Sequence, residues 1–460
     1  MTIWKPEITG RGGPLYMSIA TAIEEDIQAG ELEPGQALPT HRELAQQLAV
    51  ALTTVTRGYA EAERRGLISG EVGRGTFVRE RTAPRISEGD EAADPSLIDL
   101  TVNSLFSHSE AREVARVVRE VASGADVEWF LDYQPSGGAA RHRKLGAEWV
   151  NQRGLDAAPE QIVITSGAQH GMAVTFATIC KPGDVVLAGE FTYTGIKSLA
   201  CQQHFQLEPV ALDEHGLRPD SFEKACQRRS VRAVYCMPNL QNPTSALMPL
   251  DRRKEIAALA ERYDVMIVED DSYGFLLQDM QPLSQLAPSR SFYITSASKS
   301  LVPGLRVGYI RAPADIVERL AAAVCTTIWM ASPLLAEVLS VMIEDGTAER
   351  ILGWKRREVA ERQRLAAGIL AGLDFDSHPL SQHIWLRLPE PWRADEFAAQ
   401  AHMRGVGVTP ADHFAVGRGA PIHAVRVCLG TPVERSKLEK GLKVLAEILE
   451  GPPEPYHSVV

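Results

Sequence analysis

The stretch SASKSLVPGLRVGY, residues 296–309, begins two residues after a short apolar run at residues 292–294. Four further short runs, rich in β-branched residues, lie at residues 162–164, 185–187, 231–235 and 265–268. Segments with a helical pattern separate these four runs. Such alternation is typical of an α/β domain with a mainly parallel sheet buried on both faces. Ligands of such sheets bind outside the carboxyl ends of the strands, so we expect residues 296–309 to form part of a site.

Small or polar residues also follow each of the other four runs. The four stretches are SGAQ at residues 166–169, EFTYTG at 190–195, PNLQNPT at 238–244 and EDDSYG at 269–274. Taken singly, each has a structural explanation, such as a helix cap, a core tyrosine or a turn. Five stretches of this kind at successive strand ends predict one shared ligand site. Small residues at a helix start also let backbone amides approach a phosphate.

These stretches together resemble fold-type I pyridoxal-phosphate enzymes of the aspartate aminotransferase type, over roughly residues 98–450. The resemblance implies that Lys299 forms a Schiff base with the cofactor and that Asp270 pairs with its protonated ring nitrogen. Other expected contacts are ring stacking by Tyr193, donation to the phenolic oxygen by Asn242 and Tyr273, and phosphate binding by Gly167, Ala168, Ser296, Ser298 and Arg306, beside Ser166.

Two further residues match positions of this family. Tyr133, in YQPSGG, resembles the tyrosine that reaches the cofactor phosphate of the neighbouring subunit, which implies a homodimer. Arg426, on the apolar run at residues 425–429, matches the arginine that binds the α-carboxylate of an amino acid. The alternative for Arg426 is an ordinary surface arginine on a strand. The implied fold adds a smaller C-terminal α+β subdomain to the sheet.

Residues 14–80 show a different pattern. Apolar residues at helical spacing begin behind Pro14, and Thr40 with Glu43 forms a capping box for a second helix. A third helix is expected from Thr53, followed by a hairpin whose turn contains a Gly-Arg-Gly sequence. Three helices and such a hairpin are the plan of a winged helix-turn-helix, whose third helix enters the major groove of DNA. A small helical bundle with a hairpin is the alternative.

The stretches LPTHRELA (38–45), TVTRGYAEAERRGLI (54–68) and GRGTFV (73–78) are similar to GntR-type winged helices. The similarity implies that Arg42 contacts a DNA phosphate. The other implied DNA contacts are Thr53, Thr54, Arg57, Arg74 and Gly75. Several family members have an arginine at the position of Thr56 and a polar residue at the position of Leu52. The base contacts of this chain are therefore expected to be fewer or different.

The order of these parts resembles the MocR/GabR branch of GntR regulators. We expect a DNA-binding domain at residues 1–80, a flexible linker at 81–97 and an aminotransferase-like, cofactor-binding effector domain at 98–460. The implied function is a pyridoxal-phosphate-dependent transcriptional regulator that binds a double-stranded DNA operator as a homodimer. It would sense a small amino compound through an internal aldimine.

Two alternatives remain open from the sequence. One is a working pyridoxal-phosphate-dependent aminotransferase that carries a DNA-binding domain, since Lys299, Asp270, Tyr273 and Arg426 are the residues that transamination uses. The other is that the cofactor itself is the signal. Whether the protein turns over a substrate, and which amine it senses, is not set by these residues.

Composition narrows the class of protein. The net charge of −11 argues against a protein that coats nucleic acid through bulk electrostatics. The sequence contains no run of about eighteen apolar residues, so it predicts no membrane span. The N-terminus also lacks an apolar signal core. The six cysteines are scattered without close pairs, which favours reduced thiols over disulfides or a metal site. We therefore expect a cytoplasmic protein without a bound metal.

Overall fold

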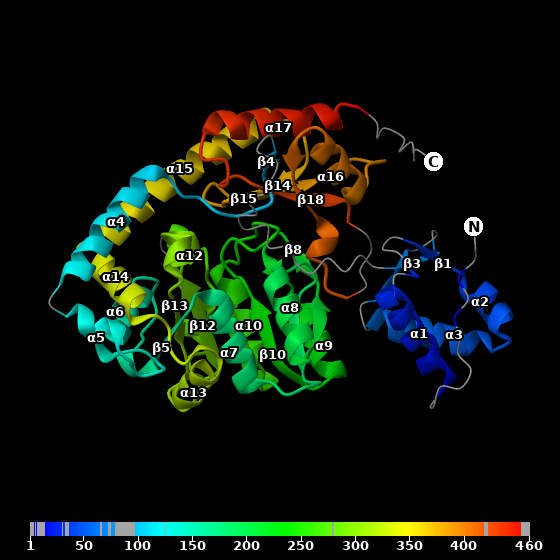
Figure 1. Cartoon of the computed structure of the whole chain (residues 1–460), viewed down its shortest axis with the longest axis horizontal. Helices are drawn as coiled ribbons and strands as arrows, with labels where there is room; N and C mark the ends of the chain where they lie inside the picture. Colours follow the sequence, from blue (N-terminus) through cyan, green and yellow to red (C-terminus); the bar gives the residue numbers. More distant parts are fainter. Residues whose placement is uncertain are drawn as a thin grey trace. The chain divides into compact units, whose positions relative to one another are not determined.

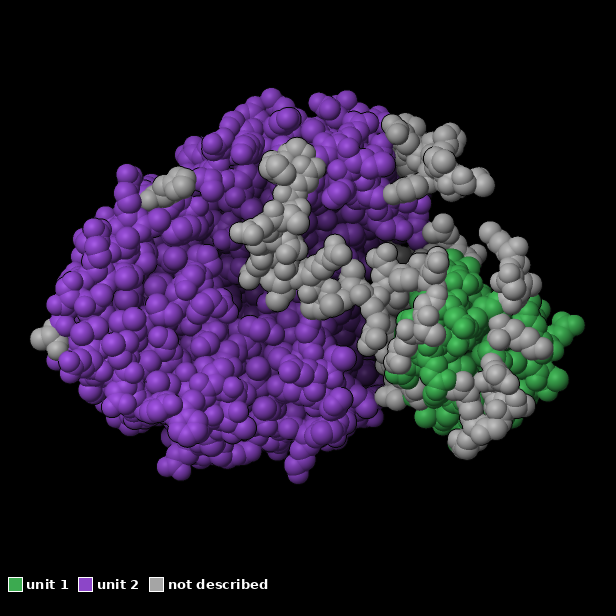
Figure 2. Space-filling view, in the orientation of Figure 1, with its two compact units in different colours: residues 1–86 green, residues 87–460 purple. Residues whose placement is uncertain are grey.

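The computed structural model of the 460-residue chain forms two compact units, residues 1–86 and 87–460 (Figure 2). It describes residues 4, 6, 14–29, 31–32, 36–64, 67–71, 75–78, 97–124, 126–277, 280–417 and 422–451. Nearly all of the predicted linker, residues 81–96, and the predicted DNA contact Arg74 lie outside the described residues. Within the described part of the chain, no helix is both long and apolar enough to cross a membrane.

Unit 1 contains three helices and a small antiparallel sheet. The helices are α1 (Leu15–Ala29), α2 (His41–Leu48) and α3 (Leu52–Arg64), and the sheet has the order β1 (Ala37–Leu38), β3 (Gly75–Val78), β2 (Ile68–Glu71). The predicted capping box is confirmed, because Thr40 and Glu43 bond each other's backbone amides at the start of α2. Strand β1 was not expected from the sequence, because two residues carry no periodicity.

The close contact of α1 with α3 organises the core of unit 1. Ile19, Val55 and Tyr59 are buried there, and the Tyr59 hydroxyl donates to the Pro39 carbonyl at 2.8 Å. A Cβ at Gly58 would lie 2.9 Å from the Ile19 Cβ. The glycine therefore allows the two helices to approach each other, and this packing orients α2 and α3.

Unit 2 is built on a seven-stranded sheet (Figure 1). Its order is β5 (Ile162–Thr165), β13 (Gly308–Arg311), β12 (Ser291–Ser296), β11 (Met266–Asp270), β10 (Val231–Cys236), β6 (Val185–Gly189), β7 (Gln206–Val210). Only β13 runs antiparallel to its neighbours in this sheet. The predicted α/β class with a mainly parallel sheet is confirmed. The sequence did not reveal β7 and β13, whose residues mix polar and apolar types.

Helices cover both faces of this sheet. On β10, Ala233 and Tyr235 belong to a core with α7 (Ala168–Ile179), α8 (Thr194–Gln203) and α13 (Val317–Ile328). Val234 and Cys236 face a second core with α9 (Pro219–Arg228) and α10 (Leu250–Arg262). The part of unit 2 that surrounds this sheet also contains the α-helices α4 (His108–Ser123), α5 (Val127–Leu131), α6 (Ala140–Asn151), α11 (Leu283–Leu286), α12 (Ala297–Ser300) and α14 (Pro333–Glu344). Two short strands, β8 (Leu212–Asp213) and β9 (Gly216–Leu217), pair with each other.

The long helix α15 (Thr347–Ile369) leads to a smaller α+β subdomain. Its four-stranded antiparallel sheet has the order β14 (Phe375–Asp376), β15 (His383–Arg387), β18 (Ala424–Cys428), β17 (Thr409–Pro410). Helices α16 (Ala394–Met403) and α17 (Arg435–Leu449) share its core. Strand β4 (Ile98–Asp99) pairs with β16 (Val406–Gly407), so the first described residues of unit 2 lie in its C-terminal subdomain.

Candidate functional site

The predicted cofactor residues lie at the carboxyl ends of the strands of the large sheet. Asp270 is the last residue of β11 and Ser296 the last of β12. Ser166 and Gly167 follow β5 directly, and Ala168 begins α7. The parallel direction of these strands brings residues that are far apart in the sequence to one edge of the sheet.

Asp270 is buried and, among the described residues, accepts hydrogen bonds from neutral groups. Its Oδ2 accepts from the Tyr235 hydroxyl at 2.9 Å, and its Oδ1 accepts from the Ser272 hydroxyl at 2.6 Å and amide at 3.1 Å. Burial raises the pKa of Asp270, and these hydrogen bonds partly oppose that rise. A carboxylate oriented in this way by neutral donors favours binding of a cationic ring nitrogen. Sequence reasoning missed the role of Tyr235, whose hydroxyl lies on a buried strand.

Tyr273 belongs to a buried polar network. Its hydroxyl accepts a hydrogen bond from Asn103 Nδ2 at 2.8 Å, and the same amide nitrogen lies 2.9 Å from His383 Nδ1. The Nε2 of His383 lies 3.1 Å from the Gln241 carbonyl, and burial lowers the pKa of His383 to about 3. His383 is therefore neutral at physiological pH, with Nε2–H donating to Gln241. Sequence reasoning missed Asn103 and His383, which belong to no motif.

The residues predicted for the phosphate surround the guanidinium of Arg306. Its Nη1 donates to Ser298 Oγ at 3.2 Å, and its Nη2 lies 3.5 Å from the Ser166 carbonyl oxygen. Gly167 has a φ of 86° at the N-terminus of α7, and a Cβ there would lie 3.0 Å from Arg306 Nη2. The glycine thus lets the exposed guanidinium lie beside the backbone at the N-terminus of α7, an arrangement that suits a phosphate.

Lys299 lies on α12, and its Nζ donates to the Asn103 carbonyl at 2.5 Å. A second lysine, Lys355 on α15, lies nearby. Its Nζ donates to the backbone carbonyls of Leu105 at 2.6 Å and of Lys299 at 3.4 Å. Burial lowers the pKa of Lys355 to about 8, while nearby Glu110 acts in the opposite direction. The amine expected to bind the cofactor is thus accompanied by a buried amine that the sequence did not single out.

Arg426 on β18 reaches the same site from the small subdomain. Its Nη1 donates to Asn242 Oδ1 at 2.9 Å and its Nη2 to the Thr101 carbonyl at 2.6 Å. The guanidinium carbon lies 4.8 Å from the centre of the Phe414 ring, and the buried Nε has no hydrogen-bond partner among the described residues. This N–H and the link to Asn242 support a binding role over that of an ordinary surface arginine.

Tyr193 and Tyr133 have different surroundings. Tyr193 caps α8, and its ring lies so close to Gly195 that a side chain there would overlap it. Tyr133 is 75% exposed, and its ring packs against Trp329, with 5.7 Å between the ring centres. The structure therefore gives Tyr133 an outward position on unit 2 and Tyr193 a fixed one.

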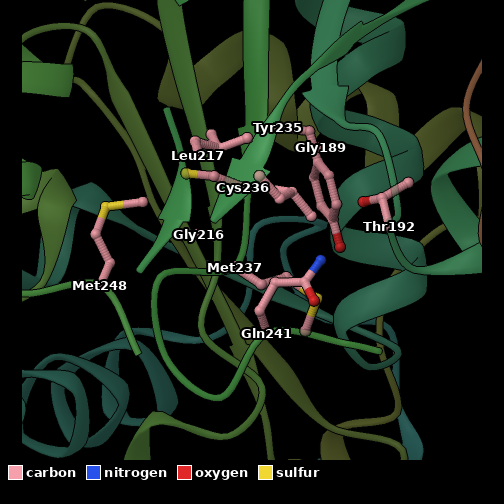
Figure 3. A pocket seen from close by; sticks show the side chains of 10 residues that line it. Gly189, Thr192, Gly216, Leu217, Tyr235, Cys236, Met237, Gln241 and Met248 are labelled. Carbon is pink, nitrogen blue, oxygen red and sulfur yellow. The ribbon is translucent and has the colours of Figure 1, made fainter. Parts of the chain in front are cut away.

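A separate small pocket lies beside the ends of β6 and β10, lined by residues that include Tyr235, Gln241 and Met248 (Figure 3). It has room for about one water molecule. A cofactor with a ring and a phosphate does not fit there. Lys299, Asp270 and Arg306, at the carboxyl edge of the large sheet, are the better candidates.

Five of the residues predicted to contact DNA are described, and they lie on the surface of unit 1. Arg42 on α2, Thr53 and Arg57 on α3, and Gly75 at the start of β3 are exposed, and Thr54 is half-buried. The Arg57 guanidinium lies 4.3 Å from the centre of the Tyr16 ring. The N-terminal turn of α3 thus presents polar side chains, as a recognition helix does.

The fold and these sites define a protein with a winged helix-turn-helix unit and an aminotransferase-type unit. Residues 15–78 match the model of the gntR family of bacterial regulatory proteins, and residues 95–445 match that of aminotransferase class I and II. The chain belongs to the MocR-type regulators, in which these two parts are joined.

Individual relatives agree with this assignment. The HTH-type transcriptional regulator YdeF of Bacillus subtilis is 30% identical over 448 residues, covering 97% of each chain. The probable rhizopine catabolism regulatory protein MocR of Rhizobium meliloti is 27% identical over 381 residues, or 76% of each chain. An archaeal alanine:glyoxylate aminotransferase is similar in fold, with a TM-score of 0.72 at 24% identity, covering 77% of this chain and 91% of that one.

Proposed function

We propose that this protein is a pyridoxal-phosphate-dependent transcriptional regulator that binds operator DNA and senses a small amino compound. The observation that carries the proposal is the position of Asp270, Lys299 and Arg306 at one edge of the large sheet, in a chain that also contains a winged helix-turn-helix. We place the protein in the cytoplasm, where operator DNA lies.

The donor set fits pyridoxal phosphate. When bound, this cofactor supplies an aldehyde that links to an amine and a ring that withdraws electrons. Lys299 Nζ would hold the aldehyde carbon, Asp270 would keep a proton on the ring nitrogen, and Tyr193 would cover the ring. Arg306, Ser298 and the amides after β5 would hold the phosphate. Asn242 and Tyr273 would orient the phenolic oxygen.

Arg426 supports an effector that carries a carboxylate. Its guanidinium faces Asn242, and its Nε–H, which has no partner among the described residues, gives it further capacity to donate. A planar fork of N–H groups matches a carboxylate better than a lysine would. We therefore assign the effector to the class of amino compounds with an acid group.

A homodimer is supported by the surface around Tyr133. The large apolar side chains of Trp129, Leu131 and Trp329 are exposed next to it, at 45%, 70% and 57%. Exposed apolar side chains that cluster in this way mark interaction sites. We propose that this surface meets a second copy of the chain, whose phosphate site Tyr133 would complete.

Transamination is the second candidate function. Lys299, Tyr273 and Arg426, which a transaminase needs, are all linked through the segment that contains Asn103 and Thr101. Release of a keto acid over many cycles, with each candidate amine in excess, would establish turnover. A spectral change that stops after one equivalent favours a sensor, and no spectral change with any amine favours the cofactor itself as signal.

The cofactor assignment is tested by borohydride reduction of the protein incubated with pyridoxal phosphate, followed by peptide mapping. We expect the label on Lys299 and its loss in Lys299→Ala. Lys355 is the internal competitor, because its amine is buried nearby and has a lowered pKa. The variant Lys144→Ala, which changes an exposed lysine, is the matched control and should label normally. A label on Lys355 or elsewhere contradicts the assignment.

The effector assignment is tested with Arg426→Ala. We expect this variant to keep cofactor and DNA binding but to lose the change in operator affinity that an amino-carboxylate effector causes in the wild type. Operator binding with and without each candidate amine is the measurement. A normal response in the variant would show that the signal enters elsewhere.

A further inference from the structure

Residues 100–105, which we call the carbonyl segment, join β4 to the loop before α4. Alternate backbone carbonyls of this segment each accept a hydrogen bond from a cationic side chain. The Thr101 carbonyl accepts from Arg426 at 2.6 Å, the Asn103 carbonyl from Lys299 at 2.5 Å and the Leu105 carbonyl from Lys355 at 2.6 Å. These three side chains come from β18, α12 and α15.

Neutral contacts hold the same segment on its other side. The Leu100 carbonyl accepts from the Cys428 amide at 2.8 Å, and the Val102 carbonyl accepts from the Thr431 hydroxyl. A side chain at Gly430 would overlap the Ser104 carbonyl. The segment therefore lies tightly between the small subdomain and the helices that carry the two lysines.

Two of the three cations are the groups predicted to bind ligands. A Lys299 nitrogen that is linked covalently to a cofactor retains at most one proton and cannot keep the geometry of a free ammonium. Both terminal nitrogens of Arg426 already donate, to Asn242 and Thr101, so a carboxylate that binds across them competes with the Thr101 carbonyl for the Nη2 donors. Only Lys355 keeps its contact irrespective of ligands.

We propose that the carbonyl segment senses occupancy of the site: the hydrogen bonds from Lys299 and Arg426 hold it, and binding of cofactor and effector carboxylate to these two side chains weakens that hold. This inference rests on the proposed function. The segment begins two residues after Ile98, and the chain runs from there through residues 79–96 to the DNA-binding unit. Release would thus act on the stretch that leads to that unit. An effector changes an equilibrium only if it binds two states differently, and exchange of these hydrogen bonds provides such a difference.

Hydrogen exchange of the full-length protein tests the proposal on the peptide that spans residues 97–106. The amides of Ile98 and Leu100, which donate to the Gly405 and Gly407 carbonyls, are the reporters. A purely structural segment should exchange more slowly, or unchanged, when a ligand binds next to it. We expect the opposite on loading with pyridoxal phosphate: exchange that is faster by on the order of tenfold, because a charge-assisted hydrogen bond is lost.

Substitutions separate the two contacts. Arg426→Ala should speed exchange of this peptide without any ligand. Lys299→Ala should do the same and show no further change with pyridoxal phosphate. Arg232→Ala is the matched control, since it removes an arginine that donates to the Ile179 carbonyl at 2.6 Å, away from the segment. It should leave the peptide unchanged.

The visible absorbance of the same samples distinguishes the two proposals. If the cofactor is linked to Lys299 but exchange of residues 97–106 is unchanged or slower, the inference is overturned and the proposed function stands. If no cofactor binds, the proposed function is overturned and the inference with it. The inference is supported if exchange becomes faster in the wild type on loading with the cofactor, and if Arg426→Ala and Lys299→Ala exchange faster than the unloaded wild type without any ligand. Arg232→Ala should match the wild type.

Discussion

Arg42, Thr53 and Arg57 are exposed on unit 1, whereas Asp270 and Asn242 of unit 2 are almost completely buried. The first group borders solvent and packs little against its own core. The second group is part of the hydrogen-bonded interior of its unit. A substitution in the first group should therefore change DNA binding alone, while one in the second should disturb the ligand site and its surroundings together.

The largest effect should come from Asp270→Asn, which tests the buried side of this comparison. The substitution removes the charge that faces the proposed ring nitrogen but keeps the shape. We expect cofactor affinity to fall by on the order of 10²–10³-fold, the usual cost of breaking a buried charge pair. Asp264→Asn, at an exposed aspartate near β11, is the matched control. Equal affinity in the wild type and Asp270→Asn, measured by absorbance titration, would refute the role of Asp270.

Gly58→Ala would sharpen the comparison, because it changes the interior of unit 1 instead of its surface. The new methyl group would meet Ile19 and the Tyr16 carbonyl. Overpacking of this kind typically costs about 1–3 kcal/mol, against a gain in helix propensity of about 1 kcal/mol. We expect operator binding to be lost at a lower temperature while cofactor binding persists.

Gly368→Ala is the control for this experiment. Gly368 lies in α15, and a methyl group added there would meet no other side chain within 4 Å in the described part of the chain. The substitution should therefore be neutral or slightly stabilising. If both variants behave alike, the contact between α1 and α3 does not limit the stability of unit 1.

Arg42→Ala tests the exposed residues of unit 1 that are predicted to contact DNA. If Arg42 neutralises one phosphate, the slope of log affinity against log salt should become shallower by about one unit for every DNA sequence. Unit 1 should remain folded, because Arg42 is exposed. Arg112→Ala removes an exposed arginine of unit 2 and should leave the slope unchanged. A change in operator preference without a change in slope would assign Arg42 to base reading instead.

The smallest effect concerns Glu110, a buried carboxyl of unit 2 that touches no predicted ligand. Burial raises the pKa of Glu110 to about 7, although Lys355 opposes this and Glu358 adds to it. The folded state therefore binds more protons than the unfolded state between about pH 4.5 and 7, and this carboxyl makes the protein less stable as pH rises through that range. Glu110→Gln should be stabilising relative to wild type at pH 7 and lose that advantage near pH 4.5. Denaturant unfolding at both pH values is the measurement, and a pH-independent difference would contradict the raised pKa.

The sequence predicted those parts of the fold and site that local patterns encode. The capping box of Thr40 and Glu43 and the five strands that precede the polar stretches are of this kind, because periodicity and helix caps depend on neighbouring residues. Asn103, Tyr235 and His383 were missed because only the tertiary fold brings them to Tyr273 and Asp270. The antiparallel strand β13 was missed for a similar reason: its direction depends on the turn around Arg306 and not on its own four residues.

The position of β13 also has a consequence for synthesis of the protein. Thr165 pairs with Gly308, so the loop after β5 cannot join Arg306 until about 140 more residues have been made. At typical elongation rates this interval is roughly 7–28 s. Unit 1, which ends before β5 begins, can fold during or before that time, as N-terminal domains generally do. A newly made chain would then have a folded winged helix-turn-helix unit before the residues proposed to hold the phosphate come together. For that period it could meet DNA before the proposed cofactor site is complete.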